Sequence, residues 1–230
     1  MPPQVYGWQH LVYLGIVIFL MILGIHLILK YVQKEKYVFV VKITGLVLLA
    51  AILWNRISIC LLRDGFKSFL PGTYCGASSF ALSLAVIFLK KDHKALHCLA
   101  YVGLLGGLLT LFYPDFIAQD ISFFYPMTIS GLVHHTIMVF LIILMIFTGY
   151  LKPNLKKWYL LPLGLSIYLT YGIFLITILK YNDAMLIFKP ILSGTKLNWF
   201  YIGMLFLPFH ASFLLVWETL KKKGLIFKKA

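Results

Sequence analysis

The chain of 230 residues has few acidic residues and few cysteines. Asp and Glu number seven, against 21 Lys and Arg, and charged residues together make up only 12 % of the sequence. The three cysteines, Cys60, Cys75 and Cys98, match neither a disulfide framework nor the spacing of a metal site. We therefore expect no required disulfide, no metal and no cofactor.

The low charge content also excludes an ordinary soluble protein. Hydrophobic residues make up 61 % of the sequence and the mean hydropathy is +0.92, so a soluble core would leave apolar surface in water. The net charge of +14 would suggest nucleic acid as the partner of a soluble domain, but the basic residues lie almost entirely in short loops and the C-terminal tail. We expect membrane lipid as the partner, and no nucleic acid.

Seven apolar runs are long enough, at about 1.5 Å per residue, to cross a bilayer core of roughly 30 Å. They predict an all-α fold: a polytopic membrane protein whose single domain, residues 1–230, is a seven-transmembrane-helix bundle. Pro208 predicts a kink in the last span, and we expect His210 beside it to bond a carbonyl that the kink frees. The expected spans are residues 11–29, 38–62, 69–89, 96–113, 127–150, 158–179 and 199–220.

The loop charges predict the orientation of this bundle. Fifteen of the 21 Lys and Arg lie on one side of the expected membrane. They are in the loops after the first, third and fifth spans, in the span ends that adjoin these loops, and in the C-terminal tail. By the positive-inside rule the N-terminus is then outside and the C-terminus cytoplasmic. The expected location is multi-pass in a cell membrane, the plasma membrane of a bacterium.

Unusual polar residues on five of the spans fall at one depth, in the outer third of the membrane. Stray polar residues would be scattered, so the shared depth favours a pocket that faces the outer leaflet or the outer water. The residues are Asn55 and Arg56, Thr73 and Cys75, Asp115, the adjacent His134 and His135, and Asn182.

Each of the reactive candidates has two interpretations. Cys75 is either a small buried hydrophobe or, with a base nearby, a thiolate nucleophile. His134 and His135 serve either in hydrogen bonds between helices or in chemistry. Arg56 either satisfies backbone carbonyls near the membrane interface or anchors a lipid phosphate or carboxylate with its forked donors.

Several segments from Leu53 onward carry a resemblance to a known family. WNRISICLLRDGFKSFLPGTYCGASSF resembles the second and third spans of the YwaF-type bacterial integral membrane proteins, which have a polar or basic group, then a Pro, a short gap and a Cys. LLGGLLTLFYPDF, SGLVHHTIMVFLIILMIFTGYLKP and YNDAMLIFKP resemble their later spans and last loop, in the same order. More remotely, the chain is similar to an animal transmembrane family regarded as cysteine-dependent phospholipid acyltransferases.

The resemblance implies a Cys–His pair, with Cys75 as the nucleophile and His135, or else its neighbour His134, as the base. One position departs from the family pattern, because Thr73 stands where a His is common. The function implied is a Cys–His acyltransferase or lipid-modifying enzyme with a lipidic acyl substrate.

The remaining residues of the outer pocket are expected to bind the substrate: Arg56 through a head-group phosphate, together with Asn55, Thr73, Asp115 and Asn182. The alternative is a non-enzymatic membrane binder or transporter of a small anionic or lipidic molecule. A third interpretation is a membrane scaffold whose polar cluster serves only helix packing.

Overall fold

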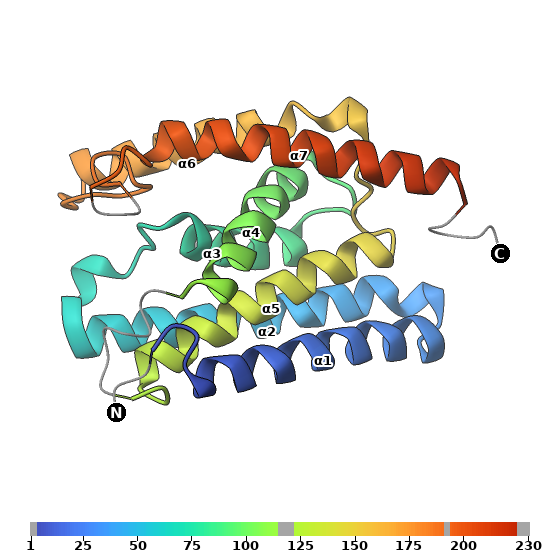
Figure 1. Ribbon diagram of the computed structural model, residues 1–230, viewed down its shortest axis with the longest axis horizontal. Helices are drawn as coiled ribbons and strands as arrows, with labels where there is room; N and C mark the ends of the chain where they lie inside the picture. Colours follow the sequence, from blue (N-terminus) through green and yellow to red (C-terminus); the bar gives the residue numbers. More distant parts are fainter. Residues whose placement is uncertain (1–3, 115–121, 191–193, 225–230) are drawn as a thin grey trace.

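The fold is all-helical over the residues that the computed structural model describes, 4–114, 122–190 and 194–224 (Figure 1). Seven α-helices lie in this part of the chain, and no strand does. Their bounds are α1 Trp8–Tyr31, α2 Tyr37–Ile59, α3 Tyr74–Phe88, α4 Lys94–Phe112, α5 Pro126–Phe147, α6 Leu160–Thr177 and α7 Trp199–Lys222.

Six of these helices, all except α3, are long and apolar enough to cross a membrane. Helix α3 has 15 residues, which at about 1.5 Å per residue gives roughly 22 Å, less than a bilayer core. The helical, membrane-spanning character expected from the sequence is confirmed. The count of seven spans and the orientation of the termini stay predictions.

The expected start of the third span, at residue 69, was wrong by five residues. Pro71 and the extended Thr73 precede the helix, and the Thr73 hydroxyl accepts a hydrogen bond from the Gly76 N–H at 3.2 Å. This N-cap fixes the first turn of α3 at Tyr74. Helix α2 likewise ends at Ile59, and one wider π-helical turn, Cys60–Asp64, follows it.

The expected end of the fifth span, at residue 150, was also too late. Gly149 has φ +70°, a left-handed conformation that glycine adopts without a steric cost, and it stops α5 after Phe147. The Leu151 N–H then donates to the Met145 carbonyl at 2.9 Å. The chain therefore turns back toward the bundle before the polar segment that begins at Lys152.

Helices α3 and α4 lie between two groups, with α1, α2 and α5 on one side and α6 and α7 on the other (Figure 1). Helix α4 packs against α3, α5 and α6, and α5 packs against α1, α2, α3 and α4. In the most apolar stretch of α5, 67 % of residues are buried, against 11 % in α1. Helix α5 is thus central, and α1 is peripheral with most of its surface available to lipid.

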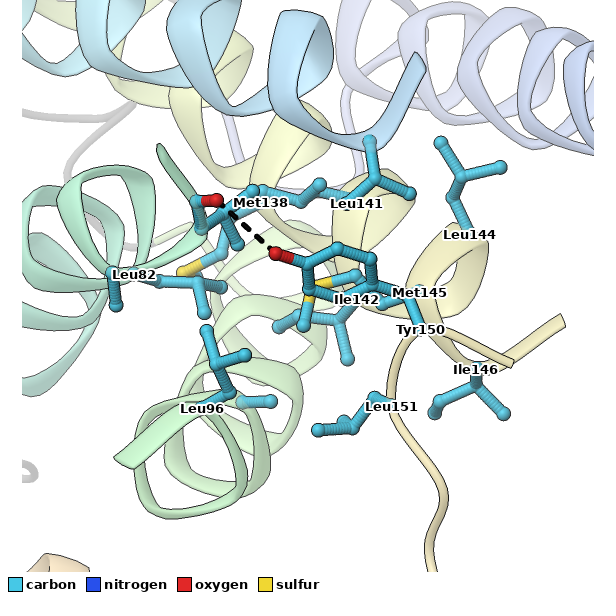
Figure 2. Close-up of a cluster of buried hydrophobic side chains, with 14 of the residues drawn as sticks. Leu82, Leu96, Met138, Leu141, Ile142, Leu144, Met145, Ile146, Tyr150 and Leu151 are labelled. Atoms are coloured by element: carbon cyan, nitrogen blue, oxygen red, sulfur yellow. Dashed lines mark hydrogen bonds between the residues drawn. The ribbon is translucent and has the colours of Figure 1, made fainter. Parts of the chain in front are cut away.

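The largest core cluster of the described residues joins α2, α3, α4 and α5, together with Trp217 of α7 (Figure 2). Leu82, Met138 and Leu141 in it are fully buried. The Tyr150 hydroxyl, which enters from the end of α5, donates to the Val86 carbonyl at 3.2 Å. Because a buried tyrosine hydroxyl needs a partner, this bond fixes the end of α5 against the last turn of α3.

The expectation for His210 was wrong. Helix α7 continues through Pro208, and among the described residues His210 makes no hydrogen bond, so it does not bond a freed carbonyl. Its buried ring packs instead on Tyr101 of α4, with ring centroids 4.1 Å apart. Packing on an aromatic face, rather than a polar partner, holds this histidine in the bundle.

Candidate functional site

Two nucleophile-bearing side chains, Cys75 and Ser79, lie one turn apart on the same face of α3. Residues four apart on a helix are neighbours, with their Cβ atoms about 5–6 Å from each other. Ser79 is fully buried and Cys75 is half-buried. This face of α3 points toward α4 and α5, as the contacts of both residues show.

Cys75 contacts α4. Its Sγ lies 3.3 Å from Thr110 Oγ1, and a methyl group placed on Gly106 would lie only 2.8 Å from that Sγ. Gly106 and Thr110 are themselves four residues apart, so they form one face of α4. The absence of a side chain at Gly106 gives the thiol its space between the two helices.

His134 of α5 reaches the same face of α3 one turn deeper. Its Nδ1 is 3.1 Å from the Ser79 hydroxyl, and that hydroxyl also donates to Met138 Sδ at 3.2 Å. The His134 side chain is buried, with 3 % of its surface exposed. The structure therefore brings a histidine from α5 onto Ser79, which lies one helical turn from Cys75 on α3.

His135 has a different environment. Its Nδ1 is 2.6 Å from the Gly131 carbonyl of its own helix, and since a carbonyl only accepts, Nδ1 carries the proton. The two histidine rings lie side by side, with centroids 4.0 Å apart. His135 is thus tied to α5, whereas His134 is tied to α3.

Cys75 forms no hydrogen bond with either histidine within the described residues; its partner is Thr110. Ser79 links the two positions, because it lies one turn from Cys75 on α3 and its hydroxyl is 3.1 Å from His134 Nδ1. Catalytic hydrogen bonds are commonly long in unliganded enzymes. The geometry is that of a site whose parts are adjacent rather than in direct contact.

The expected binding residue Asn55 joins α2 to α5. Its Nδ2 donates to the Ser130 hydroxyl at 3.0 Å and to the Met127 carbonyl at 3.3 Å. Both partners lie one or two turns before His134 on α5. Asn55 is buried, so in this structure it orients the first turns of α5.

Arg56 holds the segment between α2 and α3. Its Nε donates to the Phe69 carbonyl at 2.9 Å, and its Nη2 donates to the Ser68 carbonyl. This is the carbonyl-binding role among the two interpretations that the sequence left open. Charged donors satisfy these two backbone groups near the start of α3, so Arg56 positions the approach to Cys75.

Replacing Arg56 with lysine is expected to loosen this segment. An ammonium cannot reproduce two bonds from a planar fork, so we expect a loss of about 1–2 kcal/mol in the free energy of unfolding. Thermal unfolding of the purified protein in nanodiscs measures it. An unfolding temperature equal to that of the wild type would contradict the role given to Arg56.

Two of the remaining expected binding residues lie away from the histidines. Thr73 is exposed and caps α3, and Asn182 is exposed in the segment between α6 and α7. Asp115 lies outside the described residues. The structure thus gathers Cys75 and His134 around the inner face of α3, and it places Thr73 and Asn182 at the surface.

The segment after α6 covers the start of α3. The Met185 N–H donates to the Gly72 carbonyl at 2.7 Å, and the Tyr181 hydroxyl donates to the Leu70 carbonyl at 2.9 Å. Met185 is fully buried and has φ +52°, which is uncommon for a residue with a side chain. Sequence reasoning found the residues of this loop but not the contacts that bring it over α3.

Ser79 and Thr110 are the residues of the site that sequence reasoning missed. Their signal was present in the spacing, because Ser79 follows Cys75 by four residues and Thr110 follows Gly106 by four. Four-residue spacing identifies a shared face only when the facing helix is known. The described residues contain no group of three His, Cys, Asp or Glu side chains able to hold a metal ion.

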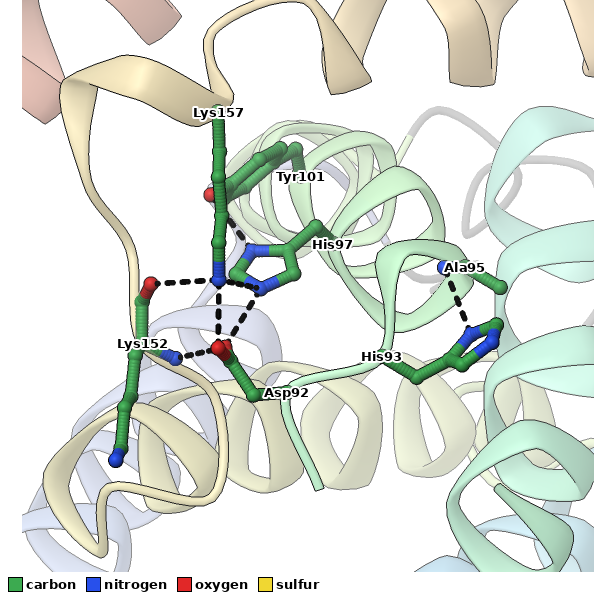
Figure 3. Close-up of polar contacts among 7 residues, drawn as sticks. All are labelled: Asp92, His93, Ala95, His97, Tyr101, Lys152 and Lys157. Atoms are coloured by element: carbon green, nitrogen blue, oxygen red, sulfur yellow. Dashed lines mark hydrogen bonds and ion pairs between the residues drawn. The ribbon is translucent and has the colours of Figure 1, made fainter. Parts of the chain in front are cut away.

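A second polar cluster lies at the other end of α3 and α4 (Figure 3). Asp92 accepts hydrogen bonds from Lys157 Nζ at 2.7 Å and from the Lys152 N–H at 2.9 Å, and its Oδ1 is 2.8 Å from His97 Nε2. His97 Nδ1 is in turn 2.9 Å from the Tyr101 hydroxyl. The cluster joins the α3–α4 loop to the α5–α6 loop.

Comparison with known protein families gives one match. The model of the TMEM164 family matches residues 5–217, which include all seven helices up to the last turns of α7. The chain belongs to the TMEM164 family. A search of curated proteins and a search of solved structures gave no match.

Membership of the TMEM164 family and the apolar helices together establish a multi-pass membrane protein. The match extends over α3, α4 and α5, so the Cys75 face and both histidines lie within the TMEM164-family region. The resemblance to YwaF-type proteins, and the bacterial plasma membrane as the location, stay predictions.

Proposed function

We propose that this TMEM164-family protein is a membrane-embedded acyltransferase that acts on phospholipids with Cys75 as nucleophile and a histidine of α5 as base. The observation that supports it is the placement of Cys75 one turn from Ser79, whose hydroxyl is 3.1 Å from His134 Nδ1. A thiol, a histidine and an apolar surrounding in one layer of the bundle fit transfer of a lipid acyl chain. Within the pair named from the sequence, this geometry favours His134 over His135.

The reaction has two balanced steps. In the first, the base takes the Cys75 proton, the thiolate attacks the ester carbonyl carbon of a phospholipid, and the carbon–oxygen bond breaks. The leaving alkoxide receives the proton from the histidine, which yields a lysolipid and a thioester at Cys75. In the second, the hydroxyl of an acceptor lysolipid gives its proton to the histidine and attacks the thioester, and the carbon–sulfur bond breaks as the thiolate regains the proton.

The chain gives the reacting groups an environment from which water is largely excluded. His134 and Ser79 are buried, and the segment 181–187 covers the start of α3 above Cys75. A thioester in such a site is protected from hydrolysis, which favours transfer to a second lipid over release of a free fatty acid.

The test is acyl transfer by Cys75→Ala in nanodiscs that contain a phospholipid with an isotope-labelled acyl chain and an unlabelled lysolipid. We expect the transfer measured by mass spectrometry to fall at least about 100-fold, because the nucleophile is lost. Cys98→Ala, a buried cysteine on α4, serves as the matched control and should keep the wild-type rate. Transfer that persists in Cys75→Ala would reject the acyltransferase.

A non-enzymatic binder or transporter is the second candidate, and one observation favours it. The Cys75 thiol is bonded to Thr110 and not to a histidine among the described residues, as expected of a structural cysteine. In that case lipid or anion binding should survive in Cys75→Ser and be lost in His134→Gln. Equal binding by both variants and the wild type would remove this alternative.

A further inference from the structure

Ser79 has a buried hydroxyl that joins His134 of α5 to the cysteine-bearing face of α3. It lies 3.1 Å from His134 Nδ1 and one turn from Cys75. Ser83, the next residue on the same face, is equally buried but donates to the Phe80 carbonyl of its own helix at 2.8 Å. Of these two serines, Ser79 is thus the one whose hydroxyl bonds to a side chain of α5.

The proton on the Ser79 hydroxyl decides which nitrogen of His134 is a base. The hydroxyl has one proton, and two acceptors lie within reach of it: Met138 Sδ at 3.2 Å and, in the opposite tautomer, His134 Nδ1 at 3.1 Å. When the proton lies toward Met138, the oxygen accepts from His134 Nδ1–H, and the lone pair of the imidazole is then on Nε2. A histidine base requires this arrangement, in which one nitrogen is held by a partner while the other takes the proton.

We propose that Ser79 is a positioning residue that sets the tautomer and ring orientation of His134 and so makes His134, not His135, the base for Cys75. His135 is held differently, because its Nδ1 donates to the Gly131 carbonyl within α5. The inference rests on the proposed function for its chemistry. It adds that a residue of α3, four positions after Cys75, determines which histidine of α5 acts as the base.

The experiment compares two substitutions of equal shape, Ser79→Thr and Ser79→Val, which differ only in the hydroxyl. The rate at which iodoacetamide alkylates Cys75 is measured from pH 5.5 to 9 in nanodiscs, with peptide mass mapping to count Cys60 and Cys98 separately. We expect Ser79→Thr to keep the histidine-dependent inflection of the wild type. We expect Ser79→Val to lose it and to show a rate at pH 7 that is about 10-fold to 100-fold lower.

Ser83→Ala is the matched control and should keep the wild-type pH profile. A structural role for Ser79 would lower the melting temperature in Thr and Val variants without changing the shape of the pH profile. Identical profiles in Ser79→Thr and Ser79→Val would overturn the inference.

The same variants separate this inference from the proposed function. If the wild type transfers no acyl chain but the Cys75 profile still depends on the Ser79 hydroxyl, the positioning role stands and the acyltransferase falls. If acyl transfer is present and its rate is the same in Ser79→Thr and Ser79→Val, the acyltransferase stands and the positioning role falls.

Discussion

Replacing Asp92 with asparagine will lower the free energy of unfolding by about 2 kcal/mol at neutral pH, because the carboxylate accepts hydrogen bonds from charged and backbone donors. Lys157 Nζ, the Lys152 N–H and His97 Nε2 all lie within 2.9 Å of its oxygens (Figure 3). Asparagine has the same side-chain shape as aspartate and tolerates the left-handed φ of +59° at this position. The loss in the free energy of unfolding therefore measures the contribution of the negative charge. Thermal unfolding of both proteins measures it.

The effect should depend on pH in a defined direction. Partial burial alone would raise the pKa of Asp92, but the hydrogen bonds from Lys157, the Lys152 N–H and His97 hold that pKa below its ordinary value of 3.8. A carboxyl with a lowered folded pKa contributes stability that is complete above the unfolded value and lost as the pH falls through the folded one. The difference between wild type and Asp92→Asn should thus be constant from pH 7 to about 5 and shrink below about pH 4.

Asp183→Asn provides the control for Asp92. Asp183 also accepts in a loop, from the Phe188 and Lys189 N–H groups at 2.9 and 3.4 Å, but these donors are neutral. Because an amide oxygen can accept from the same two N–H groups, we expect Asp183→Asn to lose less than about 1 kcal/mol in the free energy of unfolding. Equal losses for the two variants, or a difference for Asp92 that persists unchanged at pH 3, would contradict the role given to the charge.

The helices were predictable from the sequence because each is an apolar run that polar residues bound, and the bilayer length constrains runs of this kind. The starts and ends were less predictable. Pro71 and Thr73 delay α3, and Gly149 stops α5, although the surrounding residues are as apolar as those of the helices. Local caps and backbone conformation decided these bounds, and hydropathy does not detect them.

The shared membrane depth of the candidate residues stays a prediction, whereas the direction in which each side chain points could not be predicted from the sequence. Counting residues from the ends of the spans placed Cys75, His134 and Arg56 at one level. The facing of each side chain depends on which helices pack together, and this put Arg56 on the Ser68 and Phe69 carbonyls and His134 on Ser79. The spacing of Ser79 from Cys75 does not identify its partner, because a serine in an apolar span is equally compatible with a bond to its own helix, as Ser83 shows.

Replacing Gly107 with valine is expected to separate α4 from α5 and to destabilise the bundle. A Cβ at Gly107 would lie 2.8 Å from Val139 Cγ2 and 2.9 Å from Met138 Cε, closer than such atoms approach. The branched methyl groups of valine extend further into the same space, and the stiff Val139 side chain has few alternative rotamers. We expect a loss of about 3 kcal/mol in the free energy of unfolding, at the upper end of the cost of overpacking.

The control for Gly107→Val is Gly15→Val on α1. No atom lies within 4 Å of a Cβ placed at Gly15, and the residue is exposed on the peripheral helix, so its stability should change by less than about 0.5 kcal/mol. Because Met138 also accepts from Ser79, the displacement at Gly107 should reach the His134 bond as well. A Gly107→Val protein as stable as Gly15→Val would show that α4 and α5 have room to separate, and that the close approach of these helices does not hold the site together.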